Sequence, residues 1–162
     1  MEHLVLTVHA QRTLKSPIHC TGNGLHSNAK TSLTLLPAPV DTGVLFRRTD
    51  LGPSAEILAL HSNVTDSRLC TSISNGKKNG GAVSVSTIEH LMAALAGCGV
   101  ENVIVELDGP EVPIMDGSAA PFVFLIDCAG IIKQSAPRRA IQVLKEITVG
   151  NKDRWASISP SD

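Results

Sequence analysis

The sequence predicts an α+β fold: a two-layer sandwich in which two helices lie on one face of a mixed or antiparallel sheet. Short segments with strand character precede a Gly-rich turn at residues 75–81. After that turn the hydrophobic period lengthens to about 3.6 residues, which is the period of a helix. The predicted order is therefore several strands, a helix, a strand and a second helix. Such an order is typical of helices gathered on one side of a sheet.

The predicted strands are short and rich in β-forming residues. Thr31–Leu35 alternates polar and apolar residues, and Val44–Arg48 follows a glycine turn. Further strands are predicted at Glu56–Leu60, Cys70–Ile73 and Val103–Leu107. Residues 75–81 contain three glycines and two asparagines, so we predict that they form the tip of a hairpin.

The first helix is predicted at Ser86–Ala96. Ser86 and Glu89 match the S-x-x-E capping box, and Gly97 is the predicted end of the helix. Its apolar side is formed by Ile88, Leu91, Met92 and Leu95. Its opposite side carries His90, Ala93, Ala94 and Gly97. A surface helix normally has Lys, Glu or Gln there, so we expect a second helix, domain or chain to pack against this side.

The second helix is predicted at Ala119–Ala129, with Ser118 as N-cap, Pro121 in the first turn and Gly130 at the end. The segment Ala136–Arg139 has the composition of a linker, and new strand material is predicted from Ile141 to Val149. We therefore divide the chain into a first α+β domain at residues 1–136, followed at 137–162 by a linker and the first strands of a second, similar domain.

Composition and charge argue against nucleic acid as a partner. The 162 residues are 43% hydrophobic, which is enough for a folded core. They include three Phe, one Trp and no Tyr, too few for platforms that stack bases. The 14 basic and 15 acidic residues nearly cancel, so no polybasic surface is expected. Residues 79–132 contain Asp and Glu but no Lys or Arg, which fits a metal cation or an acidic surface.

No transmembrane segment or signal peptide is predicted, so we expect a cytoplasmic protein. The longest uncharged apolar run, Leu91–Val100, is far shorter than the roughly 20 residues that a membrane span needs. The N-terminus lacks the basic region of a signal peptide. The four cysteines are widely spaced without a C-x-x-C motif, so free thiols are expected.

Adjacent Glu89 and His90 are the main candidates for chemistry. A histidine between two packed layers can offer a ring nitrogen to a metal ion, and the neighbouring carboxylate can take a proton from a metal-bound water, as in H-E-x-x-H proteases. Position 94 is Ala94, so a second ligand one turn later is absent from the sequence. The alternatives are that Glu89 only caps the helix and that His90 is a hydrogen-bonded interface residue.

Residues 108–118 and His26 are secondary candidates. Two prolines and two glycines give residues 108–118 a defined path into the second helix, and a rigid connection is the simplest explanation. Within this segment, Asp116 is placed to accept hydrogen bonds from backbone N–H groups or to hold a histidine. His26 lies in a glycine-flanked turn, where it has a polar role or is structural.

A set of ordered stretches resembles a known family. They are Gln11–Leu14, Gly24–Ser27, Pro37–Pro39, Phe46–Asp50, Ser86–Leu95 and Gly109–Val123. Together they resemble the N-terminal half of the UDP-3-O-acyl-N-acetylglucosamine deacetylases, which are zinc enzymes of lipid A biosynthesis. The resemblance implies two similar α+β domains packed helix layer to helix layer.

The resemblance also implies roles for individual residues. His90 corresponds to a Zn²⁺ ligand and Glu89 to the general base in removal of the N-acetyl group from the UDP-linked acylated amino sugar. Leu69 and Cys70 match a family segment whose backbone lines the sugar site. Arg154 falls where the family often has a lysine near the nucleotide.

Departures from the family pattern concern the zinc site and one turn. The family completes the zinc site with an H-K-x-x-x-D segment in its second domain, and the sequence stops at Asp162 before any such segment. We therefore expect a truncated half-enzyme that lacks its second domain and is inactive alone. In a Gly-rich family turn, Asn23 and Asn28 occupy positions where the family has other residues. The competing function is a non-catalytic binding or assembly module that docks a partner through the small-residue face of the first helix.

Overall fold

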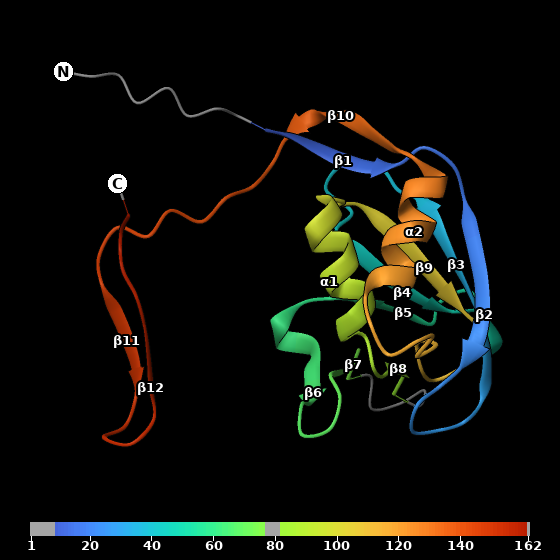
Figure 1. The fold of residues 1–162 in the computed structure, drawn as a ribbon, viewed down its shortest axis with the longest axis horizontal. Helices are drawn as coiled ribbons and strands as arrows, with labels where there is room; N and C mark the ends of the chain where they lie inside the picture. The colour runs from blue at the N-terminus through green and yellow to red at the C-terminus, as the bar shows by residue number, and fades with distance from the viewer. Residues whose placement is uncertain (1–8, 77–81, 162) are drawn as a thin grey trace.

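The computed structural model describes residues 9–76 and 82–161, and over these ranges the chain forms the predicted α+β fold. Figure 1 shows two helices side by side over one face of a sheet. Among the described residues this main sheet has the strand order β2 (Ile18–Asn23), β3 (Lys30–Pro37), β9 (Val103–Leu107), β4 (Val44–Arg48) and β5 (Glu56–Leu58).

The main sheet is mixed because β9 pairs with its two neighbours in opposite directions. It is antiparallel to β3, where Leu35 lies opposite Val105, and parallel to β4, where Phe46 lies opposite the same residue. The β2–β3 and β4–β5 pairs are antiparallel. Strand β9 therefore joins two hairpins into one sheet. The predicted strands at β4 and β9 are confirmed with their bounds, and β5 ends two residues before the predicted Leu60.

Smaller sheets surround the main one. They are formed by β1 (Ala10–Leu14) with β10 (Ile131–Pro137), and by β6 (Val64–Asp66), β7 (Ser72–Ser74) and β8 (Ser84–Val85). Two 3₁₀ turns lie at Thr49–Leu51 and His61–Asn63. Strands β1, β2 and β10 were not predicted, because polar residues, Gly or Pro interrupt their apolar alternation. Ala136 and Pro137 belong to β10, so the predicted linker was placed two residues too early.

Helix α1 (Glu89–Cys98) begins three residues later than predicted. The predicted capping box is wrong, because Ile88 is the N-cap and no side chain caps the helix. Ser86 instead pairs with the 110–112 segment, donating its N–H to Pro110 O and accepting from Val112 N. The helix continues past Gly97 and ends at Gly99, whose φ of 68° is left-handed.

Helix α2 (Ala120–Ala129) follows the prediction closely. Ala119 is the N-cap, Pro121 lies in the first turn and Gly130 ends the helix with a φ of 71°. The predicted N-cap Ser118 is one residue outside, and its Oγ accepts a hydrogen bond of 3.1 Å from Ala120 N. No helix in the described part of the chain is long and apolar enough to cross a membrane.

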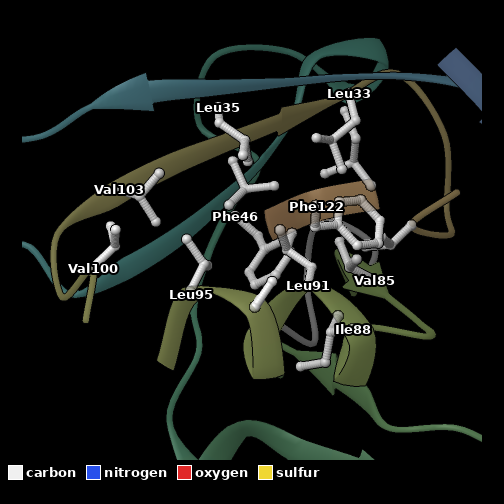
Figure 2. Packing of buried hydrophobic residues seen from close by; sticks show 14 of the residues in the cluster. Leu33, Leu35, Phe46, Val85, Ile88, Leu91, Leu95, Val100, Val103 and Phe122 are labelled. Carbon is white, nitrogen blue, oxygen red and sulfur yellow. The ribbon is translucent and has the colours of Figure 1, made fainter. Parts of the chain in front are cut away.

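The hydrophobic core lies between the main sheet and the helices, as Figure 2 shows. Phe46 from β4 meets Leu91 and Leu95 of α1, and Phe122 enters from α2. Ala94 was predicted on the side of α1 against which a second helix, domain or chain would pack, and it is buried where α2 packs beside α1. The uncovered side of α1 therefore consists of half-buried His90 and exposed Ala93, Ala96 and Gly97.

Two strands, β11 (Ile147–Gly150) and β12 (Trp155–Ile158), form a separate antiparallel hairpin (Figure 1). Every residue of both strands is exposed. New strand material thus begins six residues later than the predicted Ile141, and the division into two domains stays a prediction. The four cysteines are free, as predicted. The predicted hairpin tip at 75–81 lies mostly outside the described residues, as does the N-terminal segment before residue 9.

Candidate functional site

Glu89 and His90 are the first two residues of α1, where the helix meets the end of a loop. The Thr71 N–H donates to Oε2 of Glu89 across 3.1 Å, and Ile88 N donates to Thr71 O across 3.4 Å. These two bonds tie the segment before β7 to the start of α1. Among the described residues Oε1 of Glu89 accepts no hydrogen bond. The bond to Oε2 therefore orients the carboxylate, and Oε1 is left available.

The imidazole of His90 is half-buried and forms no hydrogen bond or ion pair with a described residue. A ring nitrogen of this kind suits a metal ion as donor. Within residues 9–76 and 82–161, however, no group of three or more His, Cys, Asp or Glu side chains is placed to hold a metal. Zinc sites use three or four protein ligands. The described residues therefore fit one ligand position of a zinc site and not a closed site.

Leu69 and Cys70 line a pocket of about 510 Å³ together with His26, Asp66 and Arg68. Leu69 is 85% exposed, so its side chain projects from the surface. Thr71 follows Cys70 directly in the chain, and its backbone N–H donates the hydrogen bond to Glu89. Thr71 and Glu89 both line a second pocket of about 360 Å³. The structure thus brings the predicted residues Leu69, Cys70 and Glu89 into one region.

Arg154 lies in the turn between β11 and β12 and is exposed. Its backbone N–H donates to Asn151 Oδ1 across 3.0 Å, and its carbonyl oxygen accepts from Asn151 N. These bonds close the hairpin turn. The structure does not bring Arg154 to the pocket of Leu69 and Cys70 through any bond between described residues, and its predicted contact with the nucleotide stays a prediction.

A buried carboxylate, Glu111, was missed in the sequence. Its side chain is only 1% exposed, and both of its oxygens accept hydrogen bonds. Oε1 accepts from Thr87 Oγ1 at 2.7 Å and from His26 N at 3.1 Å, and Oε2 accepts from Ser27 N at 2.8 Å. The only sequence feature that could have pointed to a buried carboxylate is that Glu111 directly precedes the apolar run Val-Pro-Ile-Met.

The environment of Glu111 fixes its charge. Burial alone would raise the pKa of its carboxyl, but hydrogen bonds from Ser27, Thr87 and the backbone of His26 lower that pKa to about 2. Glu111 is therefore an anion throughout the neutral range and serves as a fixed hydrogen-bond acceptor. Asp116, the acidic residue that the sequence did single out, accepts locally from Ser118 N and Oγ, at 2.9 and 2.8 Å.

The turn at residues 22–28 accommodates its two asparagines. Asn28 has a φ of 51°, a conformation that Asn tolerates better than most residues. Its Oδ1 accepts a hydrogen bond of 3.2 Å from Asn23 Nδ2, and its N–H donates to Gly24 O. Both departures from the family pattern thus support a closed turn that presents His26.

The chain is an α+β protein with two helices over one face of a mixed sheet. A candidate catalytic pair, Glu89 and His90, begins the first helix, and Glu89 lines a pocket. The chain belongs to the UDP-3-O-acyl N-acetylglycosamine deacetylase family, whose sequence profile matches residues 11–162.

Individual relatives agree with this assignment. The chain is 53% identical over 152 residues to the UDP-3-O-acyl-N-acetylglucosamine deacetylase of Cellvibrio japonicus, a match that covers 94% of this chain and 48% of the relative. The deacetylases of Thioalkalivibrio sulfidiphilus and Pseudomonas entomophila match to the same extent: 53% identity, 94% of this chain and 48% of each relative. The chain therefore spans about half the length of the curated relatives that it matches.

Proposed function

We propose that this chain is the part of a zinc-dependent deacetylase that carries the general base and one metal ligand. The substrate class is a UDP-linked N-acetylglucosamine with an acyl group on O3, and the reaction is hydrolysis of the N-acetyl group in the cytoplasmic synthesis of lipid A. Family membership over residues 11–162 supports this proposal. So does the hydrogen bond that ties Glu89, at the start of α1, to Thr71, the residue that follows Cys70.

In this proposal each residue has a defined task. His90 is one ligand of Zn²⁺, and the remaining ligands come from a second domain. When bound, the zinc ion supplies Lewis-acid activation of the acetamide carbonyl and of water. Glu89 takes the proton of the attacking water on Oε1 and passes it to the departing amine. The backbone of Leu69 and Cys70 lines the sugar, and Arg154 contacts the nucleotide.

The hydrogen bond from Thr71 N to Glu89 Oε2 is the observation that carries the proposal. It holds the carboxylate against the loop that lines the pocket, at 3.1 Å, and leaves the other oxygen available. A glutamate that merely capped α1 would bond to the N-terminal N–H groups of its own helix, and no such bond is present at this helix start. The general base is thus oriented before substrate binds.

The alternative, a binding or assembly module, would use exposed residues of the two helices as its docking surface. Ala93, Ala96 and Gly97 on α1 are exposed, and Phe124 on α2 is 68% exposed. Such an apolar surface is typical of a docking site. A deacetylase needs the same surface to receive its second domain, so the surface alone does not separate the two functions. Zinc content and hydrolysis do separate them.

A chimera tests the proposal. It joins residues 1–162 to the part of the Cellvibrio japonicus deacetylase that follows the matched region. We expect one zinc per chain by elemental analysis and release of acetate from the UDP-linked substrate. Glu89→Gln should retain the zinc and lower kcat by roughly 100-fold or more, the loss expected for a general base. His90→Ala should lose the zinc.

Glu56→Gln is the matched control for Glu89→Gln. Glu56 lies on β5 and pairs with Arg47 at 2.8 Å, on a partly exposed surface of the main sheet. Such pairs contribute little, so zinc content and kcat should stay at the level of the parent chimera. A chimera that binds no zinc and releases no acetate would favour the binding module. Near-normal hydrolysis by Glu89→Gln would remove Glu89 from the proposed role.

A further inference from the structure

Glu111 is a buried anion to which the proposed hydrolysis assigns no task. Its backbone forms an isolated β-bridge with Ser86. Its carboxylate accepts hydrogen bonds from Thr87 on one side and from the loop of His26 on the other. A buried carboxylate without hydrogen bonds is strongly destabilising, so this arrangement depends on its donors being held in place.

One donor, Thr87, has a strained backbone. Its φ is 56°, in the left-handed region that β-branched residues rarely adopt, and its side chain is 2% exposed. Its Oγ1 lies 2.7 Å from Glu111 Oε1, the length of a strong hydrogen bond to an ionised acceptor. Strain of this kind persists where surrounding contacts enforce it, and it clusters at functional sites. Thr87 is followed by the N-cap Ile88 and then by Glu89.

The other donors belong to the pocket loop. Backbone N–H groups of His26 and Ser27 bind the same carboxylate, although both residues are exposed. Gly24 completes the contact, because a Cβ at that position would overlap the Glu111 carboxylate. His26 in turn lines the pocket of Leu69 and Cys70. A single side chain therefore holds both the loop that borders the pocket and the residue that leads into α1.

We propose that Glu111 is a positioning residue that fixes the pocket loop of His26 relative to the start of α1 with Glu89 and His90. This inference rests on the deacetylase function proposed above. Glu111 touches neither substrate nor metal and acts through Thr87 on one side and the backbone of residues 26–27 on the other. Removing the Thr87 bond should release the strain at Thr87 and let the Glu89 carboxylate turn away from the reacting atoms.

The first test compares Thr87→Val with Thr87→Ser in the chimera. Valine keeps the shape of the side chain and removes the hydroxyl, whereas serine keeps the hydroxyl. Per folded molecule, we expect Thr87→Val to lower kcat roughly tenfold or more, as small displacements of catalytic groups do. KM should change less than threefold, and Thr87→Ser should stay within twofold of the parent. Thr31→Val, the same exchange at a buried threonine on β3, is the control and should leave kcat unchanged.

The second test uses the 162-residue chain itself. Amide hydrogen exchange of His26 and Ser27 should accelerate at least tenfold in Thr87→Val and stay unchanged in Thr31→Val. Equal kcat for the valine and serine variants in an active chimera, or unaltered exchange at His26 and Ser27, overturns the inference. A parent chimera without any hydrolysis overturns the proposed function instead, and the exchange measurement alone then decides whether Glu111 holds the loop.

Discussion

The buried Glu111 carboxylate should make stability depend on pH in a way that one substitution removes. The pKa of this carboxyl falls from an ordinary 4.5 to about 2 in the folded chain. A group with a lower pKa in the folded state stabilises the protein fully above the unfolded value, and this stabilisation is lost as pH falls through the folded value. The shift of about 2.5 units corresponds to about 3 kcal/mol of unfolding free energy.

The assay is urea unfolding of the parent chain and of Glu111→Gln at several pH values between 7 and 2. Circular dichroism is the appropriate signal, because Trp155 lies in the exposed hairpin and would not report on the sandwich. The difference in unfolding free energy between the two proteins should shrink by about 3 kcal/mol as pH falls from 7 to 2. Asp50, whose pKa is lowered by Arg48, titrates in both proteins and cancels. If the difference in unfolding free energy between the two proteins stays constant with pH, Glu111 is not a buried anion with a lowered pKa.

Three substitutions test other parts of the fold by urea unfolding. Thr31→Val should raise the unfolding free energy by about 1 kcal/mol, because Thr31 Oγ1 is buried without a hydrogen-bond partner among the described residues; a lower midpoint would contradict this. Gly24→Ala should lower the unfolding free energy by about 2 kcal/mol or more, since the new Cβ would overlap Glu111. The control Gly97→Ala places its Cβ in open space on α1 and should raise the unfolding free energy by about 0.5 kcal/mol. Leu95→Ala should cost about 3 kcal/mol at its 1% exposed position, and a cost below about 1 kcal/mol would argue against the core in Figure 2.

Helix α1 illustrates what local patterns predict and what they miss. Helical spacing correctly placed Leu91 and Leu95 in the core. The capping box failed, because Ser86 is committed to a bridge with Glu111 and the Glu89 carboxylate to Thr71. Both partners are distant in the sequence, so no local pattern could show them. The local pattern did indicate that another element would pack on the side of Ala94, but not that this element is α2, about thirty residues later.

The candidate site divides in the same way. Glu89 and His90 could be singled out because they interrupt an otherwise small and apolar helix side, and the family resemblance added Leu69 and Cys70. Glu111 could not, because its importance comes from donors 24 and 85 residues away, at Thr87 and His26. Buried polar groups acquire their meaning from tertiary partners, and a single sequence contains no direct record of these.

The central place of β9 has a consequence for synthesis on the ribosome. Within the described ranges, the N-terminal hairpins β2–β3 and β4–β5 share no backbone ladder with each other, and each pairs with β9 through its inner strand. Until Leu107 has left the exit tunnel, the nascent chain lacks the strand that joins these two hairpins into one sheet. Closure of β1 against β10 requires a further thirty residues, because Ala10 pairs with Pro137. Chaperone protection during this interval, when unpaired strand edges are open to misassembly, should therefore matter most for the stretch made between β5 and β10.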